Sequence, residues 1–363
     1  MRWMLIFPST ICTNIAWPTH LQRKQSRIWT TNLNGSMVKN TRPQPASFIK
    51  MIKINFAVLT FVYLLLSILP QKLQAQKIDT GQLLNHVKIL AADSLEGRRT
   101  CAPGAAKARN YILNHFKSVG LIPFFENYQQ KFVVDERGVK CDSAVNLIGS
   151  IEGTATKNKS IVISAHYDHE GIQNGKIFNG ADDNASGVAA MLEIGRYFAK
   201  NQPKHDLIFC AFDAEELGLL GSKSFVKILP DIKNSILLDI NIDMIGVSLR
   251  NELYIAGAYH SPFLKRQVNP IVNSQDQLKV LWGHDTPELG SQDWTLASDH
   301  AAFHRAKIPF LYFGVEDHAH HNQSTDTFEN LNHRFFVQAA QFILTTLIHL
   351  DAQLASNKNY QTK

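Results

Sequence analysis

Apolar runs alternate with amphipathic segments along most of the chain. Strand-like runs occur at 144–151, 160–167, 207–212, 235–243, 252–257 and 308–314. Helical spacing of apolar residues occurs at 82–91, 104–118, 184–199, 216–228, 260–273 and 333–350. Continuous apolar strands that alternate with helices are typical of parallel sheets covered on both faces. The pattern therefore predicts an α/β fold with a mostly parallel, twisted central sheet flanked by helices, and residues 120–134 are expected to add an antiparallel edge strand.

Residues 77–355 are predicted to form one domain. This part of the sequence contains no internal repeat, no low-complexity block and no linker rich in Pro, Gly and Ser. Domain boundaries usually fall in such linkers. A single α/β domain of this length can bury a large core.

The first 75 residues have a different character from the rest. Lys53 precedes an uncharged apolar run at 56–69, and a polar stretch then ends in Leu73-Gln74-Ala75. This layout is typical of a secretory signal peptide over 51–75, with cleavage after Ala75. The apolar run is short for a membrane span, although an uncleaved anchor is the alternative. We therefore expect a secreted or periplasmic protein without stable membrane association after cleavage, and we interpret 1–50 as an upstream artefact, with translation starting at Met51.

The basic charge of the chain is concentrated in this leader. The formal net charge is +6, but nine of the 37 Lys and Arg residues lie within 1–75, which contains no acidic residue. The rest of the chain has 28 basic and 31 acidic residues, and its sequence contains no basic stripe with interleaved aromatic residues. The sequence therefore argues against a nucleic-acid partner.

Three cysteines follow the leader, at positions 101, 141 and 210. Export would permit a disulfide. Cys210 lies in an apolar strand-like run and is expected to be a buried thiol, which leaves Cys101 and Cys141 as the natural pair. The sequence does not establish whether their geometry allows the bond. No CxxC spacing indicates a cysteine zinc site.

Polar side chains gather where the predicted strands end. His166 and Asp168 follow the second strand, Glu215 and Glu216 follow the third, and Asp243 ends the fourth. Ligands of open α/β sheets bind at the carboxyl ends of the strands. Histidine and carboxylate groups from separate strand ends are the inventory of a two-zinc site.

Five segments in register carry a resemblance to a known family. They are SAHYDH (164–169), NGADDNASG (179–187), FDAEELGLLGS (212–222), NIDMIG (241–246) and HAHHNQSTDTFENLN (318–332). In this order they resemble the family-twenty-eight metallopeptidases, zinc aminopeptidases of the bacterial leucyl aminopeptidase kind. The resemblance extends from LEGRRT (95–100) to the closing helix. It implies an aminopeptidase that binds two zinc ions and acts on peptide or protein N-termini.

The resemblance also implies a role for each matched residue. His166 and Asp243 would bind one zinc, Glu216 would bind the other, and Asp183 would bridge both. Glu215 would be the general base for a water activated by the metals, and Asp168 would hold the imidazole of His166. The last ligand is expected to be His321, with His320 as the alternative.

Other interpretations stay open at this point. Each segment alone could be structural, since carboxylates favour the first turn of a helix. A dipeptidase, a one-zinc glutaminyl cyclase of similar fold and a non-catalytic relative are alternative functions. His300 could contact substrate or belong to a buried network, and Trp282, Phe310 and Tyr312 could border the specificity pocket or lie in the core.

Overall fold

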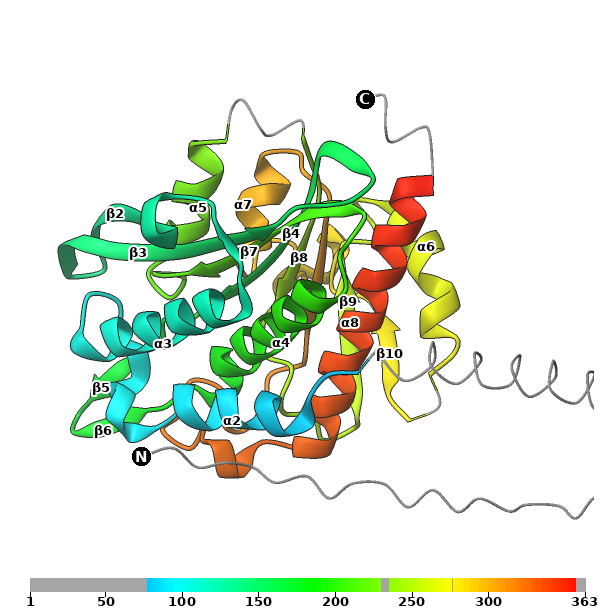
Figure 1. The fold of residues 1–363 in the computed structure, drawn as a ribbon. Helices are drawn as coiled ribbons and strands as arrows, with labels where there is room; N and C mark the ends of the chain where they lie inside the picture. Colours follow the sequence, from blue (N-terminus) through cyan, green and yellow to red (C-terminus); the bar gives the residue numbers. More distant parts are fainter. Residues whose placement is uncertain (1–76, 230–234, 276, 357–363) are drawn as a thin grey trace, which may run out of the picture. The chain divides into compact units, whose positions relative to one another are not determined.

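The computed structural model describes residues 77–229, 235–275 and 277–356, apart from the side chains of 156 and 157. The expectations for 1–50 and 51–75 lie outside these residues. The described part forms one α/β unit, as the sequence predicts (Figure 1).

A nine-stranded sheet runs through the unit in the order β1-β3-β7-β4-β8-β11-β9-β10, with β2 also paired to β3. Strands β7, β4, β8 and β11 are parallel and form the centre, while β3 and β9 join them antiparallel. The carboxyl ends of the four central strands therefore meet at one edge. The strand bounds are β1 Ile122–Pro123, β2 Gln129–Glu136, β3 Val139–Ile151, β4 Thr156–His166, β7 His205–Phe212, β8 Ile236–Ile242, β9 Glu252–Ala256, β10 Lys279–Trp282 and β11 Phe310–Gly314.

Helices cover both faces of this sheet (Figure 1). One face carries α2 (Thr80–Leu90), α3 (Pro103–Val119), α4 (Gly187–Lys200), α6 (Pro262–Val272) and α8 (His333–Ser356). The other carries the shorter α5 (Leu220–Lys227) and α7 (His300–Arg305). The order of elements matches the predicted alternation.

The side chains of the central strands alternate between two cores. In β4, Ile161 and Ile163 pack into the large core under α4, whereas Val162 packs into the smaller core with Phe225 of α5. Because successive side chains point to opposite faces, a strand covered on both faces is apolar throughout. This explains the uninterrupted apolar runs in the sequence.

The segment after β7 departs from the expected helix over 216–228. Residues Ala214, Gly218 and Leu219 have positive φ, and the amides of Gly218 and Leu219 both donate to the carbonyl of Glu215 at 2.8 Å. This turn delays the helix to Leu220. Glu215 therefore lies on a turn at the strand end and does not belong to the first turn of a helix.

Three short elements have no counterpart in the sequence prediction. They are β10, α7 and a hairpin formed by β5 (Gly171–Gln173) and β6 (Lys176–Phe178). In place of the single antiparallel edge strand expected over 120–134, the structure has two short strands, β1 and β2, which both pair antiparallel with β3. Strand β10, helix α7 and the strands of the β5–β6 hairpin are too short for periodicity to identify.

Helix α8 is long and apolar enough to cross a membrane by length and composition, but 61% of its most apolar stretch is buried in this unit. Its side chains Phe335, Phe336 and Ile343 are fully buried. The helix thus closes the core of the sheet domain.

The expected disulfide between Cys101 and Cys141 is present, with 6.4 Å between the two Cα atoms. It joins the segment before α3 to strand β3. Cys210 is a buried free thiol in β7, as expected.

Candidate metal centre

The polar residues of the predicted site come together at the shared edge of the central strands. His166 is the last residue of β4, Glu215 and Glu216 follow β7, and Asp243 follows β8. These strands are direct neighbours in the sheet. Asp183 reaches the same place from the segment that leads into α4. The topology therefore explains how residues 77 positions apart in sequence meet.

Asp183 lies between two histidines. Its Oδ1 is 3.4 Å from Nε2 of His166, and its Oδ2 is 3.6 Å from Nδ1 of His169. A second carboxylate faces each imidazole: Asp243 Oδ1 is 3.3 Å from His166 Nε2, and Glu216 Oε1 is 2.9 Å from His169 Nδ1. The central carboxylate is thus placed to be shared, as the resemblance implies for a bridging ligand.

Two sets of donor atoms lie close enough to hold a cation each. Nitrogen or carboxylate atoms of His166, Glu215 and Asp243 fall within 4.8 Å of one another, and so do those of His169, Asp183 and Glu216. All the donors are imidazole nitrogen or carboxylate oxygen, with no thiol. This donor set fits zinc and tolerates other divalent metals.

Electrostatics within the site favour bound cations. Burial and the charge of Glu216 raise the pKa of Asp183 well above its usual value. Burial likewise raises the pKa of Glu215, against the attraction of His166. Burial would lower the pKa of His166, but the charges of Asp243 and Glu215 raise it well above the ordinary value. Carboxylates crowded in this way repel one another, and a divalent cation between them offsets that repulsion.

His321 is the histidine of the 318–321 cluster that faces Asp183. Its Nε2 is 3.8 Å from Asp183 Oδ2, and its Nδ1 is 2.8 Å from Asp317 Oδ1. His320 instead contacts the Thr325 hydroxyl at 3.0 Å. The choice of His321 over His320 as the last ligand stays a prediction, and this geometry is consistent with it.

Asp168 contacts the turn that carries the two glutamates. Its carboxylate accepts the amide of Glu215 at 3.0 Å, the amide of Glu216 at 3.3 Å and the Thr100 hydroxyl at 3.2 Å. The His166 Nδ1 lies 3.2 Å from the Asp168 carbonyl and 3.7 Å from its carboxylate. The carbonyl is the closer acceptor for the imidazole, while the carboxylate holds the glutamate turn.

Arg98 is a site-supporting residue that the sequence analysis missed. It is fully buried, and its guanidinium donates to the carbonyls of Tyr167 at 2.8 Å, Leu90 at 2.7 Å, Asn179 at 2.5 Å and Gly180 at 2.8 Å. It therefore joins the segment after β4 to the segment before Asp183. Its signal was its place in LEGRRT, where the family resemblance begins.

Asp326 and His318 hold the loop that presents Asp183. The Asp326 carboxylate accepts the amides of Asp182 at 2.9 Å and Asp183 at 3.0 Å. His318 Nε2 lies 2.8 Å from the Asp182 carboxylate. Nothing in the sequence spacing of Asp326 indicates that its carboxylate binds backbone amides.

The segment around His300 is a buried polar network. His300 Nδ1 contacts Asn241 Oδ1 at 2.9 Å, and its Nε2 contacts the Trp294 carbonyl at 2.8 Å. The neighbouring Asp299 is also fully buried, and burial raises its pKa to about 7. Of the two interpretations of His300, the structure favours the buried network.

A cavity of about 200 Å³ opens over the donor atoms. Met244, Trp294, Tyr312 and Val315 line this cavity together with the carboxylates. Of the three aromatic residues considered from sequence, Tyr312 borders this cavity, Phe310 lies in the core, and Trp282 contacts Asn269 of α6. Trp294 was not anticipated.

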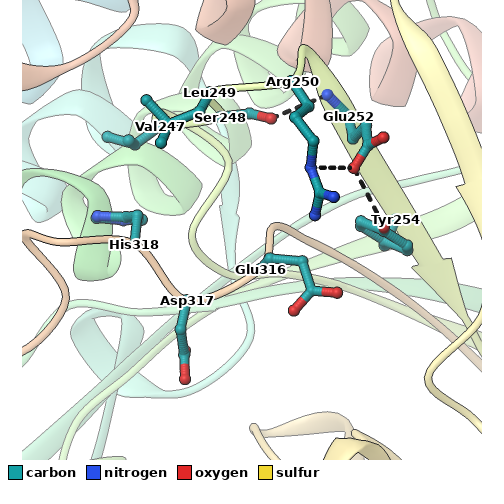
Figure 2. Close-up of a pocket in the computed structure, with 9 residues that line it drawn as sticks. All are labelled: Val247, Ser248, Leu249, Arg250, Glu252, Tyr254, Glu316, Asp317 and His318. Atoms are coloured by element: carbon teal, nitrogen blue, oxygen red, sulfur yellow. Dashed lines mark hydrogen bonds and ion pairs between the residues drawn. The ribbon is translucent and has the colours of Figure 1, made fainter.

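A second cavity, of about 90 Å³, adjoins the first through Asp317, which lines both. Figure 2 shows Arg250 between this aspartate's segment and strand β9, with its guanidinium Nε 3.1 Å from Glu252 Oε2. The Tyr254 hydroxyl donates to the same oxygen at 3.2 Å. These contacts pair Arg250 and Tyr254 with Glu252, all three of which line the second cavity.

Two curated bacterial proteins are similar in sequence to part of this chain. Over 173 residues the chain is 34% identical to aminopeptidase YwaD of Bacillus subtilis, covering 46% of this chain and 35% of that protein. Over 185 residues it is 27% identical to the alkaline phosphatase isozyme conversion protein of Escherichia coli, covering 47% of this chain and 53% of the relative. The chain spans about a third to a half of these curated relatives.

Solved structures share the fold at low sequence identity. A Zn-dependent exopeptidase from Parabacteroides distasonis matches with a TM-score of 0.60 at 19% identity, covering 76% of this chain and 99% of that one. Porphyromonas gingivalis glutaminyl cyclase matches with a TM-score of 0.62 at 17% identity, covering 75% and 99%. BSAP, a zinc aminopeptidase from Bacillus subtilis, matches with a TM-score of 0.58 at 17% identity, covering 75% and 95%. Such similarity shows the fold alone.

The sequence model of Peptidase family M28 matches residues 146–347, which include every predicted ligand and the glutamate turn. This match covers more than half of the chain and the whole strand edge described above. The chain therefore belongs to Peptidase family M28.

Proposed function

We propose that the chain is a zinc-dependent aminopeptidase that removes residues from the N-termini of peptides or proteins with the help of two metal ions. The observation that carries the proposal is Asp183, whose two carboxylate oxygens face separate groups of ligand-type side chains. The activities in the names of YwaD and BSAP support the direction of cleavage.

Five residues would hold the metals. His166 and Asp243 would bind one ion, Glu216 and His321 the other, and Asp183 both. Zinc at such a site supplies a Lewis acid and lowers the pKa of bound water toward neutrality. The side chains around the zinc ions would determine which substrate atoms the ions can reach.

Glu215 would move the proton. It borders the cavity beside His166 and Asp243, and burial raises the pKa of its carboxyl group. A base of raised pKa can accept a proton from the attacking water and deliver it to the nitrogen of the leaving amine. Asp168 would fix the direction of this carboxylate, because it holds the amides of Glu215 and Glu216.

The cavity would limit cleavage to one end of the substrate. At about 200 Å³ it is small, and Trp294 and Tyr312 are among the residues that line it. A terminal residue with a free amino group can enter such a space beside the carboxylates. We propose that the limited space favours a chain end over a chain that continues in both directions.

Export is part of the proposal. Residues 51–75 carry the signal-peptide pattern, and the Cys101–Cys141 disulfide is the kind of bond that persists in oxidising compartments. We accordingly propose a secreted or periplasmic enzyme.

The direct test is digestion of one peptide in three forms by the zinc-loaded protein, followed by mass spectrometry. We expect stepwise loss of N-terminal residues from the free peptide and no cleavage of its N-acetylated form. Glu215→Gln should reduce the rate about 10²- to 10⁴-fold, and Glu170→Gln, whose carboxylate contacts Gln173 outside the cavity, should not. Loss of C-terminal residues would contradict the proposal.

The third form begins with glutamine and tests the cyclase alternative. Formation of an N-terminal pyroglutamate without hydrolysis would identify a one-zinc cyclase instead of a peptidase. No reaction on any form, with no metal bound, would indicate a non-catalytic relative.

A further inference from the structure

The HYDH segment places a second histidine in the metal centre. His169 follows His166 by three residues, and its side chain is fully buried. The two imidazoles lie against opposite oxygens of the same carboxylate, that of Asp183. No role follows for His169 from the family resemblance as stated above.

The surroundings of the two histidines are closely parallel. His166 faces Asp183 and Asp243 at 3.4 and 3.3 Å, and His169 faces Asp183 and Glu216 at 3.6 and 2.9 Å. Each imidazole nitrogen thus completes a triangle with the shared carboxylate and with one carboxylate from a neighbouring strand end. The same geometry that makes His166 a ligand applies to His169.

The second group of donor atoms contains His169 and does not contain His321. Nδ1 of His169 falls within 4.8 Å of carboxylate oxygens of both Asp183 and Glu216. His321 approaches Asp183 only from outside this group, at 3.8 Å, and is a quarter exposed. On this geometry His169 is the more central nitrogen donor of the two.

The backbone holds His169 in this orientation. Its amide donates to the Arg98 carbonyl at 3.4 Å, and its ring packs on Gly180, where a Cβ atom would come within 2.5 Å of the imidazole. Gly180 also has a φ of +59°, which favours glycine. The close contact leaves the ring little freedom to turn away from Asp183.

We propose that His169 is a direct ligand of the second metal, through Nδ1, together with Asp183, Glu216 and His321. The inference rests on the proposed metal pair but does not depend on which reaction the pair performs. It makes the two sites unequal, because four protein donors surround the second ion and three surround the first. Closed four-donor zinc sites are typically structural, whereas catalytic ones keep a position open. The open position would lie at the first site, beside Glu215.

The alternative role for His169 is a hydrogen-bond donor to Glu216. Loss of such a supporting partner typically weakens metal affinity 10- to 100-fold. Loss of a ligand should weaken binding of the second metal by more than this. His169→Gln keeps a hydrogen-bond donor, and it should not restore that binding. His169→Ala and His169→Gln therefore form a matched pair.

The experiment uses the full chain loaded with Co²⁺, which shifts the ring N–H protons of ligating histidines out of the ordinary NMR range. We expect three such exchangeable signals in the wild type, from His166, His169 and His321, and two in His169→Gln together with more than 100-fold weaker binding of one Co²⁺. Two signals in a wild type that binds two Co²⁺ would overturn the role of His169 and leave the proposed function intact.

The wild-type count decides the question even where the variants do not fold. A wild type that binds no Co²⁺ would overturn both the role of His169 and the proposed metal pair. Three signals from a protein without peptidase activity would support His169 while contradicting the proposed function.

Discussion

Replacement of Arg98 by methionine should strongly destabilise the protein, because this side chain organises the backbone beneath the metal centre. Its guanidinium donates to four buried carbonyls at 2.8 Å or less, those of Leu90, Tyr167, Asn179 and Gly180, and to a fifth, that of Asp183, at 3.4 Å. Methionine fills a similar volume but offers no donor, so these carbonyls lose that partner.

The magnitude follows from two opposing effects. A buried carbonyl that loses its donor costs about 2 kcal/mol, so four cost about 8 kcal/mol. Burial lowers the pKa of Arg98 to about 10, against the charges of Asp183 and Asp326. Relief of this burial penalty returns roughly 3 kcal/mol. We therefore expect Arg98→Met to lower the free energy of unfolding by about 5 kcal/mol.

Urea denaturation of the purified variants measures this difference. Arg98→Lys is the matched control, because an ammonium group keeps the charge but has only three donors. We expect it to lie between the wild type and Arg98→Met. A loss of less than about 1 kcal/mol in Arg98→Met would refute the reasoning, because it would show that the four carbonyls find other partners.

Four further outcomes are expected. Removal of the metals by a chelator should lower Tm and abolish activity reversibly, since a ligand present at 100 times its Kd stabilises the folded state by about 2.7 kcal/mol; an unchanged Tm would argue against a metal that binds the folded state. Cys101→Ser with Cys141→Ser should cost about 2–4 kcal/mol, because the bond closes a 40-residue separation; equal stability of wild type and variant in urea would contradict this. Asp326→Asn should weaken metal binding about 10- to 100-fold, because the amides of Asp182 and Asp183 lose a charged acceptor, and calorimetric titration with zinc measures it. Burial lowers the pKa of His115 from 6.5 to about 4, so His115 binds more protons in the unfolded chain than in the folded one between these pH values. The free energy of unfolding should therefore decrease as the pH is lowered from 6.5 to 4. His115→Gln should make this decrease smaller in denaturation curves measured at several pH values.

The sequence predicted helices and strands well where the periodic pattern of apolar residues extended over many residues. The central strands and the helices α2, α3, α4, α6 and α8 matched the apolar periodicity within a few residues. The start of α5 was wrong, because positive φ at Ala214 and Leu219 is not visible in a hydrophobic pattern. Strand β10 and helix α7 were too short to carry a periodic signal.

The site, too, contains residues that the sequence indicates and residues that it does not. His166, Glu215, Glu216 and Asp243 could be proposed because they lie at strand ends and belong to motifs, and Asp183 because it belongs to the motif that leads into α4. His169 was overlooked within one of those motifs, since spacing alone does not show that its ring turns back toward Asp183. Arg98 and Trp294 could not be assigned, because their contacts are with backbone carbonyls and cavity space that only the folded chain creates.

The central claim is that this edge of the sheet holds a pair of metals with Asp183 between them. The most direct test is the zinc content per chain of the full protein after zinc loading and dialysis against metal-free buffer. We expect two zinc ions in the wild type and fewer than two in Asp183→Asn. One zinc or none in the wild type would contradict the account.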